Sequence, residues 1–465
     1  MNMINVRRLT VMTFLGAGML SGISAQVPPQ LVETLKGTKI PPHCDLQSRS
    51  DYAKEQNITI RKNRITAAST QIDVKTAKAA LFPSLSFSTS QQVVNRPYQE
   101  TSSRVSGSEI ISSNSKTSYN GNYGLNASWT LYNGNKRLKT IQQEKLNNQV
   151  AELDVATSEN NIQESIAQVY IQILYAAESV KVNESTLQVS IAQRDRGQEL
   201  LNAGSIAKSD FAQLEAQVST DRYQLVTAQA TLEDYKLQLK QLLELDGENE
   251  MNIYLPALSD ENVLAPLPTK KDVYISALSL RPGIVASKLN VEASELGIGI
   301  AKSSFLPTIS LSAGIGTNHT SGSDFTFGEQ VKNGWNNSIG LSVSVPIFNN
   351  RQTKSAVQKA KLQYETSMLS LLDEQKTLYK TIEGLWLDAN SAQQRYAAAN
   401  EKLKSTQISY ELISEQFNLG MKNTIELLTE KNNLLQAQQE QLQAKYMAIL
   451  NTQLLKFYQG DQLAI

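Results

Sequence analysis

The sequence has very few residues of the kinds that catalyse reactions or bind metals. It contains one cysteine and two histidines among 465 residues. Cys44 has no partner for an intramolecular disulfide, and it lies too far from the N-terminus to be a lipoprotein acylation site. His43, Cys44 and Asp45 are consecutive, and three adjacent residues converge poorly on one metal ion. We therefore expect no metal site.

Net charge and catalytic motifs are also lacking. The 44 basic residues balance 44 acidic ones, so the chain has no electrostatic footprint for a polyanion such as nucleic acid. Ser205 and Lys208 fit a Ser-x-x-Lys pattern, but the companion motifs that make this pattern catalytic are missing. No phosphate-binding loop or dinucleotide fingerprint is present. The sequence predicts neither an enzyme nor a cofactor.

Long apolar runs are scarce. Residues 1–25 have Arg7 and Arg8, an apolar stretch from Leu9 to Leu20, and small residues before Gln26. This pattern indicates an export signal, because the apolar run is too short to span a membrane easily. No later stretch approaches the roughly 18 apolar residues of a spanning helix. Residues 26–49 are rich in proline at their two ends and indicate an extended leader.

The main feature that is present is an internal repeat. Asn202 and Gly204 recur as Asn418 and Gly420, and every pair is separated by 216 residues. Glycine adopts a positive φ without steric cost, so 202–205 and 418–421 are predicted to be sharp turns between helices. Two copies of one unit are expected, over 50–255 and 272–465, with a connector at 256–271.

Each predicted turn lies between two long segments without proline. The segments 136–201 and 351–417 predict helices of about 100 Å, and the returning segments 206–245 and 424–460 predict helices of about 60 Å. Shorter helices are expected over 50–80 and 272–304, stacked end to end with the returning ones. Apolar residues in 206–245 recur every three and four positions, and Asp221 alone interrupts them. This spacing predicts coiled-coil packing.

Four strands are predicted, at about 85–97, 117–132, 308–319 and 334–348. In the last three, apolar residues alternate with Ser, Asn and Gly, so one face is apolar and the other polar. A globular sandwich also alternates, but these strands have the length and the terminal aromatics of membrane strands. Asn126 and Ser342 would then face a lumen. The positions predicted to face lipid are Tyr123, Leu125, Trp129, Trp335, Ile339 and Leu341.

Four strands cannot close a membrane barrel, and lipid does not tolerate open sheet edges. Three chains would supply twelve strands, an even number within the known range. We therefore expect a homotrimer.

Taken in this order, the elements resemble the TolC-like outer-membrane efflux proteins over nearly all of residues 50–460. The most specific marks are the two glycine turns, Ala-Leu-Phe-Pro-Ser-Leu-Ser at 80–86, Phe-Leu-Pro-Thr-Ile-Ser at 305–310, and the strand ends Leu-Tyr-Asn-Gly at 131–134 and Ile-Phe-Asn-Asn at 347–350. The resemblance implies a mainly helical chain with a membrane β-barrel part, forming a trimer with a twelve-stranded barrel and a helical tunnel into the periplasm. It further implies a passive exit duct of a tripartite efflux or type I secretion system. Such a duct works with a periplasmic adaptor and an inner-membrane pump.

The resemblance also assigns roles at the turns, which form the periplasmic mouth in this family. Asp210 and Lys422 stand where the family has an acidic and a basic gate residue. Phe417 stands where some members have tyrosine, so a hydroxyl contact is lost. Glu426 keeps the charge of an acidic ring inside the mouth, whereas Thr429 does not. Asn202, Gly204, Asn418 and Gly420 would meet the adaptor.

Two other classes of protein share part of this pattern. A non-conducting periplasmic coiled-coil scaffold or adaptor would explain the helices, but not the alternating strands. An exported hydrolase would need an active site that the sequence lacks. The transported substrate is not encoded in any motif, because a lumen lined by Gln, Asn and Ser carries little selectivity.

Overall fold

The computed structural model describes residues 46–98, 102–106, 109–113, 116–245, 263–321, 323 and 325–463. The predicted signal segment 1–25, the leader as far as residue 45 and part of the connector 256–271 lie outside the described residues. His43, Cys44 and Asp45 lie outside them as well.

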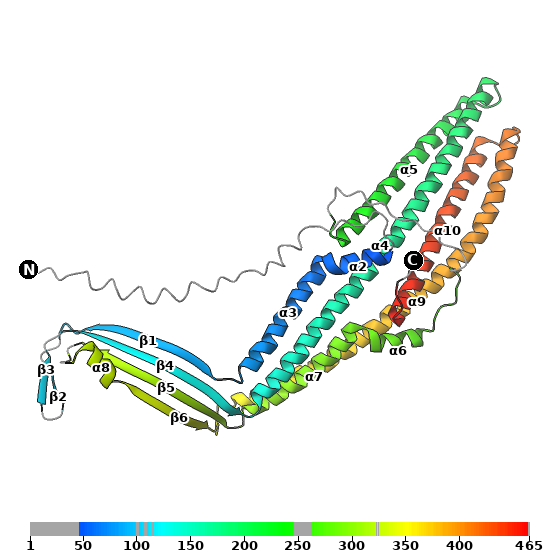
Figure 1. Cartoon of the computed structure of the whole chain (residues 1–465). Helices are drawn as coiled ribbons and strands as arrows, with labels where there is room; N and C mark the ends of the chain where they lie inside the picture. Colours follow the sequence, from blue (N-terminus) through cyan, green and yellow to red (C-terminus); the bar gives the residue numbers. More distant parts are fainter. Residues whose placement is uncertain are drawn as a thin grey trace, which may run out of the picture.

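The molecule is elongated, with a β-sheet at one end and the turns of two helical hairpins at the other (Figure 1). In chain order the elements are α2 (Leu46–Gln56), α3 (Ile58–Ala79), β1 (Ser84–Asn95), β2 (Ser102–Ser106), β3 (Glu109–Ser113), β4 (Thr117–Asn133), α4 (Lys136–Asn202), α5 (Lys208–Leu242), α6 (Lys270–Leu280), α7 (Pro282–Ser303), β5 (Thr308–Thr320), α8 (Phe327–Asn333), β6 (Asn336–Ser344), α9 (Gln352–Asn418) and α10 (Thr424–Gln459).

The long helices are equal in the two repeats. α4 and α9 each contain 67 residues, which at 1.5 Å per residue is about 100 Å. α4 turns back into α5, and α9 turns back into α10 (Figure 1). Among the described residues, no helix carries an apolar stretch long enough to cross a membrane.

Each shorter helix is broken in two, where a single helix was expected over 50–80 and over 272–304. Asn57 begins α3, and its side-chain oxygen accepts the N–H of Thr59 at 2.9 Å. Pro282 begins α7, a position where its missing N–H costs no helical hydrogen bond. Arg281 follows Asn57 by 224 residues, the interval that also separates Pro307 from Pro83. The breaks therefore occur at the same place in both repeats.

The main sheet is antiparallel with the strand order β1-β4-β5-β6, so the β4–β5 pair joins the two repeats at its centre. A β-bulge lies between Thr130 and Tyr132. The prediction of four strands is incomplete, because the hairpin β2–β3 lies between the first two predicted strands. The last strand, predicted over 334–348, extends only from Asn336 to Ser344, and α8 and Trp335 precede it.

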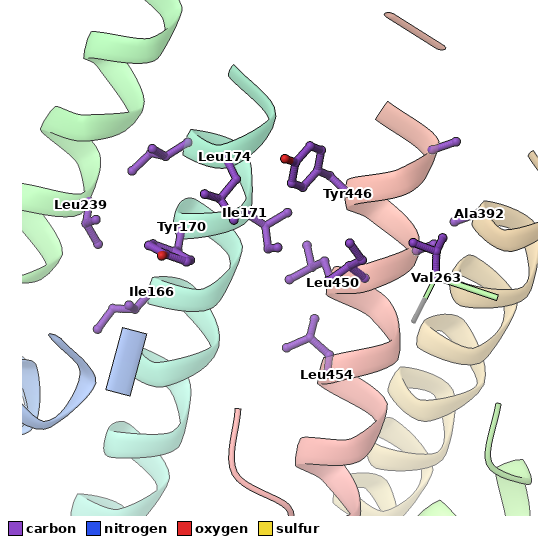
Figure 2. Close-up of a cluster of buried hydrophobic side chains, with 14 of the residues drawn as sticks. Ile166, Tyr170, Ile171, Leu174, Leu239, Val263, Ala392, Tyr446, Leu450 and Leu454 are labelled. Carbon is purple, nitrogen blue, oxygen red and sulfur yellow. The ribbon is translucent and has the colours of Figure 1, made fainter. Parts of the chain in front are cut away.

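The largest buried cluster lies where the two hairpins meet. The middle of α4 and the C-terminal half of α10 face each other, and α5 and α9 cover the outer sides (Figure 2). Tyr170, Ile171 and Leu174 of α4 are at most 2% exposed, and Leu454 of α10 is 3% exposed. This packing fixes the two repeats of one chain against each other.

Candidate functional site

The two hairpin turns have the same backbone geometry. Gly204 has φ +72° and Gly420 has φ +74°. In the first turn the N–H of Ser205 donates to Leu200 O at 2.8 Å, and that of Gly204 donates to Leu201 O at 3.0 Å. These two bonds form a Schellman motif, and residues 416–421 repeat them. A Cβ at either glycine would meet no atom of the described residues within 4 Å, so the positive φ is the reason for glycine there.

Both turns present an exposed surface. Asn202 and Asn418 are exposed, and Leu419 and Met421 of the second turn are 74% and 64% exposed. The second turn is thus more apolar at its tip than the first. Two largely exposed apolar side chains at the end of a helical hairpin suit contact with another protein.

The returning helices begin with acidic residues that cap them. The N–H of Ala207 donates to Asp210 Oδ2 at 3.3 Å. In the second hairpin, Asn423 and Glu426 form a capping box, in which the N–H of Glu426 donates to Asn423 Oδ1 at 2.9 Å. Asp210 and Glu426 therefore hold their own helix ends in place, whatever else they contact.

Within one chain, the candidate gate residue Lys422 pairs with Glu426 and not with Asp210. Lys422 Nζ donates to Glu426 Oε1 at 2.6 Å. This hydrogen bond, followed by the one from the N–H of Asn423, holds the pKa of Glu426 below its ordinary value. Within the described part of the chain no ion pair joins Asp210 to Lys422. Phe417, near the end of α9, is buried, with 4% of its surface exposed. The sequence did not reveal that Glu426 and Lys422 are partners.

The strand register sorts the side chains of the sheet onto two faces. Trp129, Leu311 and Leu341 lie in one cross-strand row, and Asn126, Gly314 and Ser338 lie in another on the opposite face. The apolar face is uncovered along much of its length, with Ile339 78%, Leu341 64%, Leu125 39% and Trp129 39% exposed. Tyr123 is half-buried on the same face. Trp335 is 57% exposed but lies just before β6.

A sheet with one exposed apolar face, joined to long helical hairpins, is found in known proteins. A family model described as "Outer membrane efflux protein" matches residues 50–244 and 273–460. The chain belongs to this family. It is therefore a protein of the outer membrane, and it is not an enzyme.

The relatives of this chain are distant in sequence. The outer membrane efflux protein BepC of Brucella suis biovar 1 (strain 1330) is 24% identical over 294 residues, which cover 63% of this chain and 61% of BepC. The outer membrane protein TolC of Escherichia coli (strain K12) is 23% identical over 311 residues, covering 65% and 62%. The chain thus spans about three-fifths of the length of these relatives.

Solved structures are similar over more of the chain. A structure of CusC aligns with a TM-score of 0.76 at 18% identity, covering 92% of this chain and 96% of that one. The outer-membrane channel OprN aligns with a TM-score of 0.73 at 18% identity, covering 90% of each chain. At this identity the likeness is one of fold.

Two further clusters of side chains could not be predicted from the sequence. In the first, the ammonium group of Lys431 contacts Asp221 Oδ2 and Ser190 Oγ, joining α10 to α5 and α4. Gln217 Nε2 also donates to Asp221 Oδ1, at 2.9 Å. The Lys431 and Asp221 side chains are 3% and 1% exposed. Burial lowers the pKa of Lys431, and the carboxylate of Asp221 opposes that shift.

The second cluster lies at the break between α6 and α7. The Arg281 guanidinium pairs with Glu164 of α4 at 3.0 Å and lies 3.6 Å from the ring centroid of Tyr458. Burial raises the pKa of Glu164, and Arg281 opposes that rise. Burial and the charge of Glu164 raise the pKa of Tyr458 to about 12. In the first repeat, Asn57 Nδ2 donates to Leu242 O at 3.1 Å. In both repeats the residue at the break therefore holds the end of a returning helix.

Proposed function

We propose that three copies of this chain form the exit duct of a tripartite efflux or type I secretion system, a passive channel for drugs or other small molecules. The observation that carries the proposal is the four-stranded sheet, which has one apolar face and one face of Ser, Asn and Gly. Its outer strands, β1 and β6, pair with no further strand in the described residues. Open edges are not tolerated in lipid, so neighbouring copies must close the sheet, and three copies give twelve strands.

Exposed apolar residues on the helices support an assembly of several copies of this chain. Ile65 and Ile72 of α3 are one heptad apart and 58% and 60% exposed. Leu362 and Leu369 of α9 are also one heptad apart and 61% and 66% exposed. A heptad stripe without a partner is typical of a coiled-coil surface that another helix covers.

The experiment that tests this function combines extraction with conductance. The protein should leave the outer membrane only with detergent, migrate as a trimer in unheated denaturing gels, and conduct ions in planar bilayers. A monomer that leaves without detergent and does not conduct would instead support the periplasmic scaffold.

We further propose that the hairpin turns meet a periplasmic adaptor, which links the channel to an inner-membrane pump. The exposed Leu419 and Met421 support this proposal. A photo-crosslinking residue at position 421 should capture one periplasmic protein. A residue of the same kind at Leu387, which is 52% exposed on the side of α9, should not capture it. Equal capture at both positions would remove the turns from the docking site.

The facing of the strands gives a first prediction. Leu125 lies opposite Ile315 on the apolar face, and Asn126 lies opposite Gly314 on the polar face. Leu125→Arg should cost about 2–4 kcal/mol near the bilayer middle, and it should sharply reduce the yield of heat-resistant trimers. The neighbouring control Asn126→Arg should assemble normally. If arginine at 126 blocks assembly and arginine at 125 does not, the polar face meets lipid.

The mouth gives a second prediction. We propose that Asp210 of one repeat faces Lys422 of another around the threefold axis, with Phe417 packed behind Lys422 and Glu426 as a ring of negative charge. An exposed pair contributes about 0–1 kcal/mol. Three copies acting on one aperture would therefore shift the closed–open equilibrium by up to about 3 kcal/mol.

The test replaces both partners. Asp210→Asn with Lys422→Ala keeps a side-chain acceptor for the N–H of Ala207 and should raise single-channel conductance in planar bilayers. Arg196→Ala with Glu199→Ala is the control, because that exposed pair near the same turn is 2.7 Å apart within α4 alone. Equal conductance of the first variant and the wild type would make Asp210 and Lys422 ordinary solvated residues.

A further inference from the structure

The short helix α8 lies beside the sheet, at the end far from the long helices (Figure 1). Thr317 Oγ1 donates to Val331 O of α8 at 2.7 Å. The His319 ring meets the Phe327 ring edge-on, with 5.1 Å between centroids. Side chains alternate along a strand, so Thr317 and His319 share the face of Leu311 and Ile315. α8 therefore covers the far end of the apolar face.

This placement is fixed by many specific contacts. Thr326 and Glu329 form a capping box that starts the helix. The N–H of Thr320 donates to Gln330 Oε1 at 2.8 Å, which ties α8 to the end of β5. Gly121, paired with His319, leaves room for the imidazole, because a Cβ there would lie 2.2 Å from the ring. Specific hydrogen bonds and side-chain packing thus hold α8 in a defined position on the sheet.

Large aromatic side chains are exposed around α8. Phe325 is 59%, Phe327 49% and Trp335 57% exposed. They stand beside polar residues of the same segment, including the exposed Lys332. Aromatic rings mixed with polar groups are typical of the layer between hydrocarbon and water.

The depth of α8 on the sheet agrees with that layer. The apolar row of β5 begins at Ile309, next to the helices, and α8 meets β5 at Thr317 and His319. Eight to ten residues of a strand tilted by about 40° rise roughly 20–26 Å. The apolar band of an outer-membrane barrel is about 25 Å tall. α8 therefore lies at the outer boundary of this band.

We propose that α8, with Phe325, Phe327 and Trp335, lies in the outer interfacial layer of the membrane and binds the headgroup region of its lipids. The inference rests on the proposed function, in which the apolar face meets lipid. It adds a lipid-binding surface to the channel and fixes the depth of the sheet from the outer side.

The test uses tryptophan fluorescence, because the chain has three tryptophans. Trp129→Phe with Trp386→Phe leaves Trp335 alone. This variant is reconstituted into phosphatidylcholine vesicles brominated near the headgroup or near the chain ends. Trp335 should lose most of its fluorescence with the shallow bromines, much less with the deep ones, and little with aqueous iodide. Strong quenching by iodide alone would place α8 in water, and quenching by none would place it against another copy; either result overturns the inference.

Two controls separate this inference from the function on which it rests. Trp386 donates its indole N–H to Pro268 O in the helical part, so a protein that keeps only Trp386 should be insensitive to brominated lipid. Trp129 lies at the other end of the apolar face, where its indole N–H donates to Leu81 O at 2.7 Å. If Trp129 alone is quenched by lipid and Trp335 is not, only the role of α8 fails. If brominated lipid does not quench Trp129 either, the proposal that the apolar face of the sheet meets lipid is wrong.

Discussion

Lys431→Met is expected to lower the stability of the helical hairpins by about 3–5 kcal/mol, because it leaves the carboxylate of Asp221 buried without its cation. Asp221 is 1% exposed and would retain only neutral partners, Ser190 and Gln217. Lys431 lies between Leu427 and Leu434 on the buried side of α10, so water has little access to the site. Thermal unfolding of the detergent-solubilised protein, followed by circular dichroism, measures the loss.

Two variants separate the charge from the packing. Lys431→Met with Asp221→Leu removes both charges and should recover most of the lost stability, since buried ion pairs are often replaceable by apolar side chains of similar size. Lys402→Met is the matched control, because Lys402 and Glu440 are 2.8 Å apart and 41% exposed each. Its effect should stay within about 1 kcal/mol. A single Lys431 variant as stable as this control would show that Asp221 is not held in the buried, paired state.

The position of this pair bears on how the mouth opens. Lys431 follows Gly420 by eleven residues and Asp221 follows Gly204 by seventeen, which places the pair about 16–26 Å behind the tips. It joins the two hairpins of one chain close to the proposed gate. We therefore expect the paired hairpins to move together near the mouth, and the double apolar variant to change single-channel conductance even where its stability is normal.

The long-range organisation of the chain could be predicted from the sequence, because it follows from local sequence patterns that occur in both repeats. The 216-residue repeat predicts helices of equal length around Gly204 and Gly420, and α4 and α9 do have equal lengths. Alternation predicts the two faces of the sheet, and the register aligns Leu125 with Ile315 and Asn126 with Gly314. Such patterns need no knowledge of which helices become neighbours.

What could not be predicted depends on contacts between distant residues. Asp221 interrupts the predicted apolar seam of its helix, but its partner Lys431 lies 210 residues away on another helix. The starts of α7 and α8 are of a different kind, because their sequence signals are local. Pro282 marks the start of α7, and Thr326 with Glu329 marks the start of α8, so both elements could have been predicted from the sequence alone.

Arg281→Met is expected to destabilise the junction between α6, α4 and α10 by about 3 kcal/mol at neutral pH. The substitution leaves Glu164, whose side chain is 19% exposed, without its cation. It also removes the stacking of the guanidinium on Tyr458, although the methionine fills much of the same space. The matched control is Arg64→Met, because Arg64 is 45% exposed and pairs with Glu159 at 2.9 Å. That control should change stability by no more than about 1 kcal/mol.

The loss at Arg281 should depend on pH in one direction. Burial already raises the pKa of Glu164, and Arg281 opposes the rise, so Arg281→Met should raise this pKa further. A carboxyl whose pKa is higher in the folded state binds its proton more tightly when folded, so stability is lost as pH rises through that pKa and recovered as pH falls. As the pH is lowered from about 7 to about 5, the melting temperature of the variant should therefore move toward that of the wild type. Adding Glu164→Gln should remove this pH dependence, because no carboxylate remains to be buried. A gap between variant and wild type that is the same at both pH values would show that Arg281 acts through packing on Tyr458 and not through the charge of Glu164.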